Sequence, residues 1–153
     1  MKNRKVYLAY GSNLHLGQMS RRCPDARPLG ATTLPNHQLL FRGSRWSAFA
    51  TVEPKDGVSV PALLWSISPK DELRLDYYEG YPNFYRKETV TVELDGKPVE
   101  AMVYIMNDGK PLGSPSWTYY NTILEGYKAN GLDLDFFYNA AAEAMGGYPN
   151  VED

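Results

Sequence analysis

The sequence is poor in the residues that commonly bind metals or form disulfides. Its 153 residues include one cysteine and two histidines. Cys23 has no partner for a disulfide within the chain, which fits a reducing compartment, and we expect a cytoplasmic protein. Two imidazoles and one thiol are also a poor set of ligands for zinc or a related metal. We therefore expect no metal site.

Long apolar runs and an excess of one charge are also missing. No run approaches the roughly 20 apolar residues that span a bilayer, so no membrane segment is expected. The short apolar stretch after Lys5 runs directly into Gly11, so we expect no signal peptide. The 16 basic and 18 acidic residues are interspersed and give a net charge of −2. This balance lacks the basic footprint of a nucleic-acid-binding protein.

What is present is an ordinary globular composition that is rich in tyrosine. Hydrophobic residues make up 43% of the chain and charged residues 22%. This length and composition predict one domain over residues 1–153. There are 12 tyrosines. They can pack half-buried at the surface, or their hydroxyls can line a pocket, and composition alone leaves both interpretations open.

Hydrophobic patterning predicts short strands, mostly in hairpins, together with helices. Strands are expected over 6–10, 29–34, 37–42, 47–53, 58–67, 85–94 and 99–106. Helices are expected over 14–22, from Ser68-Pro69 to Gly80, over 116–129, and from Asp133 or Asp135 to about 145. Turns at Pro35-Asn36 and at 54–57 would each connect two strands. Because strands and long helices do not alternate strictly, we expect an α+β domain around a twisted, barrel-like sheet.

The first predicted strand stops abruptly at Gly11-Ser12-Asn13. Glycine permits close approach to the backbone, and successive N–H groups at a strand-to-helix turn can bind a carboxylate or phosphate. The same residues also suit a plain turn in which Asn13 caps the following helix. The stretch lacks the repeated glycines and the lysine of a nucleotide-binding loop.

Glu79 ends a predicted helix, in the segment Leu75-Asp76-Tyr77-Tyr78-Glu79-Gly80. A negative charge at this end opposes the helix dipole, and aromatic residues surround it in the sequence: Tyr77, Tyr78, Tyr81, Phe84 and Tyr85. Such surroundings would raise the pKa of the carboxyl group and suit a general base. The alternative is a solvated surface carboxylate.

Ser12 and Cys23 are the candidate nucleophiles. Ser12 lies outside a Gly-x-Ser-x-Gly motif, and only His15 or His37 is available to activate it. Cys23 follows two arginines, which favour a thiolate, but no catalytic partner can be identified. We expect Cys23 to pack as a small apolar residue instead.

Several short motifs occur in order over most of the chain, and in them it resembles the γ-glutamylcyclotransferases and their relatives. The motifs are Tyr10-Gly11-Ser12-Asn13-Leu14, the Leu75–Gly80 segment, Tyr85, Tyr104-Ile105-Met106, a Ser-Pro loop, Tyr119 and Lys128-Ala129-Asn130-Gly131-Leu132. The first motif alone is moderately specific. Together with the downstream Glu79, it forms a strong signature of the family.

The resemblance implies a small, mixed and mostly antiparallel β-barrel with packed helices. It also implies an enzyme that cyclises a γ-glutamyl group to 5-oxoproline and releases an amino acid or amine, without a cofactor. Glu79 would be the general acid/base. The implied substrate-binding residues belong to the first strand, the turn after it and three later tyrosines: Tyr7, Leu8, Ala9, Tyr10, Gly11, Ser12, Asn13, Tyr85, Tyr104 and Tyr119.

The identity of the leaving group stays open, because residues 81–84, Tyr-Pro-Asn-Phe, depart from the family pattern. Two alternatives are a γ-glutamylamine cyclotransferase that acts on a biosynthetic product and a non-catalytic ligand-binding module on the same fold. The expected partner is a small γ-glutamyl substrate rather than nucleic acid or membrane. The oligomeric state is also open, with a homodimer as one option.

Overall fold

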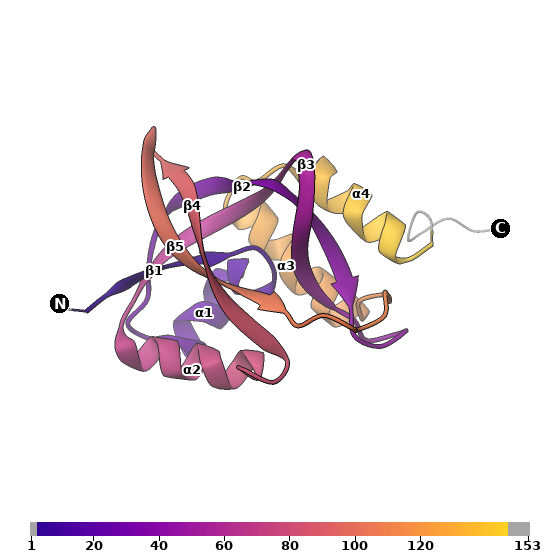
Figure 1. Ribbon diagram of the computed structural model, residues 1–153, viewed down its shortest axis with the longest axis horizontal. Coiled ribbons are helices and arrows are strands. Elements are labelled where there is room, and N and C mark those ends of the chain that lie inside the picture. Colours follow the sequence, from indigo (N-terminus) through magenta and orange to yellow (C-terminus); the bar gives the residue numbers. More distant parts are fainter. Residues whose placement is uncertain (1–2, 147–153) are drawn as a thin grey trace.

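The structure, a computed structural model that describes residues 3–146, combines a curled sheet with helices on its outside (Figure 1). Its elements in chain order are β1 (Lys5–Ala9), the 3₁₀ helix η1 (Ser12–Leu14), α1 (Leu16–Arg22), β2 (Arg27–Arg42), β3 (Phe49–Ile67), α2 (Pro69–Glu79), β4 (Tyr85–Leu94), β5 (Lys97–Met106), α3 (Trp117–Ala129) and α4 (Leu134–Ala144). Within the described residues, no helix is both long and apolar enough to cross a bilayer.

The first strand lies in the middle of a five-stranded sheet with the order β2-β3-β1-β5-β4. Tyr7 on β1 pairs with Trp65 on the antiparallel β3 and with Met102 on the parallel β5. The other two pairings are antiparallel. The predicted α+β class and mostly antiparallel sheet are therefore confirmed, and the turn after β1 begins inside the fold.

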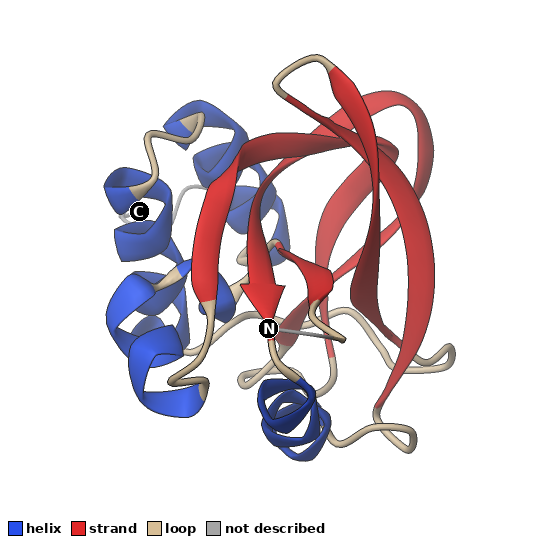
Figure 2. Ribbon diagram, turned by 90° about the vertical axis from the view of Figure 1, so that its left-hand side faces the viewer, coloured by secondary structure: helices blue, strands red, loops and turns tan. Residues whose placement is uncertain are grey.

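The sheet curls strongly but does not close into a barrel (Figure 2). Its edge strands β2 and β4 share no backbone ladder among the described residues. They touch where the Thr32 hydroxyl donates a 2.6 Å hydrogen bond to the Glu93 carbonyl oxygen. The expected barrel is thus an open one, because a true barrel needs continuous backbone pairing around the ring.

The two segments predicted as turns, 35–36 and 54–57, instead form an irregularity within one long hairpin. Strands β2 and β3 pair from Arg27–Ser66 to Arg42–Phe49, so the chain reverses at residues 43–48. The register shifts between Pro35 and His37, at the level where Asn36 adopts a left-handed φ of 59°. The Asn36 side chain accepts a 3.0 Å hydrogen bond from the Gly57 N–H. The turn signals at 35–36 and 54–57 therefore mark facing bulges rather than chain reversals.

The β4–β5 hairpin and helices α2, α3 and α4 lie where the sequence predicts them. Asp95 and Gly96 have φ values of 53° and 78°, as a tight two-residue hairpin turn requires. Ser68 caps α2 by accepting from the Asp71 N–H, and the Asp71 carboxylate accepts from the Ser68 N–H. Gly80 ends this helix with a φ of 67°.

The N-terminal helix differs from the prediction at its start. Asn13 does not cap it; the cap is His15, whose Nδ1 accepts a 3.0 Å hydrogen bond from the Gln18 N–H. The amide of Asn13 points elsewhere and donates to the Tyr7 hydroxyl at 2.9 Å. The short η1 turn separates strand from helix, which frees Asn13 to become part of the interior.

Candidate active site

A pocket of about 410 Å³ opens between the end of β1, the start of β3 and the end of α2. Buried tyrosines form its inner part, and exposed residues of α2 form its rim. It is lined by Tyr7, Leu8, Tyr10, Gly11, Ser12, Asn13, Phe49, Ala50, Tyr77, Tyr78, Glu79, Gly80, Phe84, Tyr85, Tyr104 and Tyr119.

All but one of the site residues expected from the sequence line this pocket. The exception is Ala9, which is 1% exposed and packs in the core. Phe49 and Ala50 were missed, because they stand at the start of β3 and belong to no recognisable motif. Ala50 is held at the pocket by long-range hydrogen bonds, since its N–H donates to the Tyr119 hydroxyl and its carbonyl oxygen accepts from the Tyr85 hydroxyl. No local sequence signal reports these contacts.

The turn after β1 approaches its neighbours closely at Gly11. A Cβ at this position would lie 3.2 Å from the Ala50 Cβ and 3.5 Å from the Tyr119 hydroxyl oxygen. Any larger residue would fill the space between the turn and these two neighbours. Among the described residues, the N–H groups of Gly11 and Ser12 have no hydrogen-bond acceptor. They are therefore available to a ligand in the pocket.

Glu79 is half-buried on the pocket wall. Within residues 3–146, its carboxylate has no hydrogen-bond or ion-pair partner. Burial raises the pKa of Glu79 to about 7, and the nearby positive charge of Arg22 lowers it in part. The raised pKa thus arises from desolvation, whereas the sequence suggested an opposing helix dipole as well. A carboxyl group of this kind can both accept and donate a proton near neutral pH.

Three tyrosine hydroxyls in the pocket donate to the protein itself. Tyr10 donates to the Tyr104 carbonyl oxygen at 2.7 Å, Tyr85 to the Ala50 carbonyl oxygen at 2.6 Å, and Tyr104 to the Asp76 carboxylate at 2.6 Å. Burial raises the pKa of all three, so they remain neutral. Their rings shape the wall, while their O–H protons are already used.

Tyr7 and Tyr119 differ because their hydroxyl oxygens accept hydrogen bonds. Tyr7 accepts from the Asn13 amide at 2.9 Å, and Tyr119 accepts from the Ala50 N–H at 3.0 Å. Neither O–H proton has an acceptor among residues 3–146. Burial raises the pKa of both hydroxyls, so each keeps its proton. The pocket therefore holds two neutral hydroxyl donors that a ligand can use.

Neither candidate nucleophile has the partners that nucleophilic catalysis requires. The Ser12 hydroxyl lies 2.9 Å from the Tyr78 hydroxyl, while His15 contacts Gln18 and Glu125 through its two ring nitrogens. Cys23 is buried, and burial, followed by the nearby Asp71, raises the pKa of its thiol to about 12. In the part of the chain that is described, no cluster of three or more histidine, cysteine or acidic residues could hold a metal.

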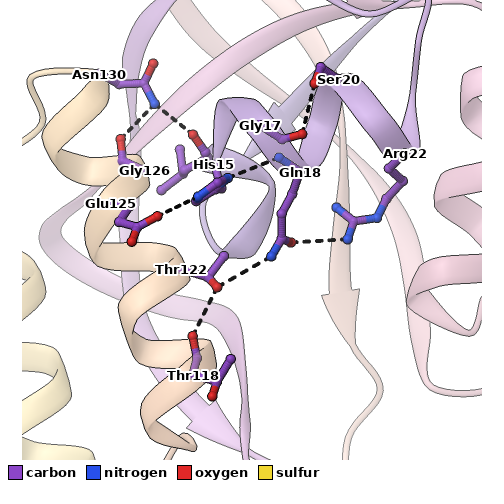
Figure 3. A network of polar contacts seen from close by, with 11 residues as sticks. His15, Gly17, Gln18, Ser20, Arg22, Thr118, Thr122, Glu125, Gly126 and Asn130 are labelled. Carbon is purple, nitrogen blue, oxygen red and sulfur yellow. Dashed lines mark hydrogen bonds and ion pairs between the residues drawn. The ribbon is translucent and has the colours of Figure 1, made fainter.

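Helix α3 fixes the position of the turn and of α1 through the contacts drawn in Figure 3. The Asn130 amide donates to the carbonyl oxygens of Leu14 and Gly126, at 2.9 Å and 2.8 Å. His15 contacts the Glu125 carboxylate at 2.7 Å. These bonds join the end of the pocket turn to a helix more than a hundred residues further along the chain.

The chain is similar in sequence to known gamma-glutamylcyclotransferases. Residues 7–121 match the family model described as "Gamma-glutamyl cyclotransferase, AIG2-like". Human gamma-glutamylcyclotransferase is 28% identical over 140 residues, which cover 86% of this chain and 74% of that protein. Gamma-glutamyl cyclotransferase gliK of Aspergillus fumigatus is 29% identical over 154 residues, covering 81% and 56% of the two chains.

The fold comparison agrees with the sequence comparison. A solved structure of a protein named gamma-glutamyl cyclotransferase superposes with a TM-score of 0.79 at 26% identity. The match covers 98% of this chain and 91% of the other. The family model spans the turn after β1, Glu79 and Tyr119. The chain therefore belongs to the gamma-glutamyl cyclotransferase, AIG2-like family.

Proposed function

We propose that this protein cyclises the γ-glutamyl group of a small amide to 5-oxoproline and releases the amine or amino acid attached to it. The observation that supports this proposal most is the isolated carboxyl group of Glu79, whose pKa is raised to about 7 by burial in the tyrosine-lined pocket. Cyclisation needs one group that moves a proton between two nitrogens, and a carboxyl that titrates near neutral pH is suited to that task.

In the proposed reaction, the substrate supplies both nucleophile and electrophile. The Glu79 carboxylate accepts a proton from the α-ammonium group, and the resulting amine attacks the γ-carbonyl carbon. A bond forms between this carbon and the α-nitrogen, and the bond to the leaving nitrogen breaks. Glu79 gives its proton to the leaving nitrogen as that bond breaks, then takes the second proton from the new ring nitrogen and passes it to the departing amine, which leaves as an ammonium ion while Glu79 returns to its carboxylate form. The proton and charge balance requires no nucleophilic side chain and no cofactor.

The pocket lowers the barrier mainly by holding the substrate in a folded conformation. Placing the two reacting atoms of one molecule in near-attack geometry is worth about 7–11 kcal/mol. Available donors for the substrate carboxylate or the developing oxyanion are the N–H groups of Gly11 and Ser12 and the hydroxyls of Tyr7 and Tyr119. The rings of Tyr10, Tyr85 and Tyr104 would exclude water around the folded chain.

A turnover assay tests this function directly. Incubation of the protein with γ-glutamyl-alanine is expected to release 5-oxoproline and alanine in equal amounts, measured by liquid chromatography and mass spectrometry. Glutamate is not expected, because ring closure rather than water attack breaks the amide. Formation of glutamate in place of 5-oxoproline, or binding of the dipeptide without any product, would contradict the proposal.

The reaction is expected to be pH-dependent on both sides of neutrality. The value of kcat/KM should fall tenfold per pH unit below about pH 7, because the protonated Glu79 carboxyl cannot accept the ammonium proton. It should also fall at alkaline pH, where the substrate α-amine loses its proton before it binds. An acidic limb centred below pH 5 would show that a group other than the buried carboxyl controls the rate.

A further inference from the structure

A basic groove continues from the rim of the pocket along the outer face of α2. It is lined by Arg22, Leu73, Arg74, Tyr77 and Tyr78, and the last two also line the pocket. A second, adjoining groove is lined by Gln18, Arg21, Arg22 and Tyr78. The ring of Tyr78 thus stands between Glu79 in the pocket and a surface that carries three guanidinium groups.

The guanidinium of Arg22 is held in place before any ligand binds. It stacks on the Tyr78 ring, with 3.5 Å from its central carbon to the ring centroid. It donates to the Asn13 side-chain oxygen and, at 3.2 Å, to the Gln18 side-chain oxygen. Gln18 is itself bound to Thr122 on α3, as Figure 3 shows. A positive group fixed in this way loses little conformational entropy on binding an anion.

The positive charge of the groove is largely unneutralised. Within residues 3–146, no carboxylate lies within 4 Å of Arg21 or Arg22, and Arg74 reaches Asp71 only at 4.0 Å. Two acidic side chains of α2 are paired elsewhere, since Glu72 in its first turn and Asp76 further along both bind Lys87 on β4. The neighbouring carboxylates are Asp71, at 4.0 Å from Arg74, and Glu79, whose pKa the Arg22 charge lowers. Neither makes a close ion pair with the groove, so the guanidinium groups can bind an anionic group.

We propose that Arg22 and Arg74 bind an anionic group carried by the leaving amine and so determine leaving-group specificity. This inference rests on the proposed function and deepens it. The leaving nitrogen must lie next to Glu79, and Tyr78 directly precedes that residue at the rim. A carboxylate on the leaving amino acid lies within one residue length, about 3.5 Å, of the scissile amide, and the groove begins at Tyr77 and Tyr78, which it shares with the pocket. Its binding to a guanidinium would be charge-assisted.

A matched pair of substrates isolates this contact. γ-Glutamyl-alanine carries a carboxylate on the leaving amine, and γ-glutamyl-ethylamide lacks it but has the same reacting groups. For the unmodified protein, kcat/KM is expected to be about tenfold higher for γ-glutamyl-alanine, the effect of one or two charge-assisted hydrogen bonds near the surface. The preference should decrease at high salt, because the groove is solvent-accessible.

The substitution Arg74→Gln is expected to lower this ratio about threefold or more, mainly through KM for γ-glutamyl-alanine. Arg74 is suitable because its side chain is 48% exposed, so the fold does not depend on it. Arg22→Gln should lower the ratio further, although it will also slow both substrates because Arg22 holds Asn13. Arg27→Gln is the charge-matched control, since Arg27 is exposed on β2 and lines neither groove, and its ratio should be unchanged.

The outcomes separate the two proposals. Equal kcat/KM values for the two substrates, or a ratio that Arg74→Gln does not change, would overturn the inference while leaving the cyclisation intact. Release of 5-oxoproline from neither substrate would instead overturn the proposed function, and the inference with it. A ratio that falls equally in Arg27→Gln would mean that net charge, rather than this groove, sets the preference, and would overturn the inference.

Discussion

Replacing Glu79 with glutamine is expected to reduce kcat for 5-oxoproline release by about 10²–10⁴-fold, the usual contribution of a general acid/base. The amide keeps the shape of the side chain but neither accepts nor donates the proton that the reaction moves. Substrate affinity should change little, because the pocket donors lie on the turn and on the tyrosines. Single-turnover and steady-state rates with γ-glutamyl-alanine measure the effect, and Glu100→Gln, an exposed carboxylate on β5, is the matched control.

The same variant has a second readout that does not depend on activity. The pKa of Glu79 is raised by burial to about 7, so its contribution to stability is fully present below the unfolded-state pKa near 4.3 and is lost as the pH rises through 7. Glu79→Gln removes this loss. As the pH rises from 5 to 8, the free energy of unfolding of Glu79→Gln, measured relative to that of the unmodified protein, should therefore increase by roughly 1–3 kcal/mol. If this variant keeps the original turnover rate, or if its stability depends on pH as that of the unmodified protein does, the proposed role of Glu79 is contradicted.

The second large effect is expected from Gly126→Ala in α3. A Cβ at Gly126 would lie 2.5 Å from the Leu14 Cβ and 2.7 Å from the Leu14 carbonyl carbon. Since the backbone of the turn must move, we expect a loss of about 2–3 kcal/mol in stability from overpacking. A displacement of the turn by about 1 Å would also lower kcat/KM by up to about 100-fold, because the N–H donors of Gly11 and Ser12 would be misplaced.

Helix propensity alone would predict a gain in stability from Gly126→Ala rather than the loss expected here. Alanine in a helix interior is normally favoured over glycine by about 1 kcal/mol. Gly17→Ala in α1 is the matched control, because its new Cβ would lie 3.2 Å from a side-chain atom of His15, a milder contact than the 2.5 Å approach to Leu14. Chemical denaturation of both variants, with the turnover assay, measures the two effects. If Gly126→Ala were as stable as Gly17→Ala, the turn would not depend on close packing against α3.

Local sequence signals determined several elements of this fold. Helix α2 begins at a serine–aspartate capping box and ends at a left-handed glycine, and both signals lie within a few residues of the helix that they limit. The β4–β5 hairpin follows from Asp95-Gly96 in the same way. The position of Glu79 at a helix end beside aromatic residues was also readable from the sequence, because it depends on these local boundaries.

Tertiary structure decided the rest. Proline, glycine and asparagine mark both chain reversals and bulges, so only the long-range pairing of β2 with β3 reveals that 35–36 and 54–57 face each other within one hairpin. Phe49 and Ala50 lie at the pocket through contacts with Tyr119 and Tyr85. Arg22 lies beside the pocket, where it contacts the lining residues Asn13 and Tyr78. The raised pKa of Glu79 depends on how many groups surround it in space. Capping and turn propensities act between neighbours in the chain, whereas burial and electrostatic environment are set by residues far apart in sequence.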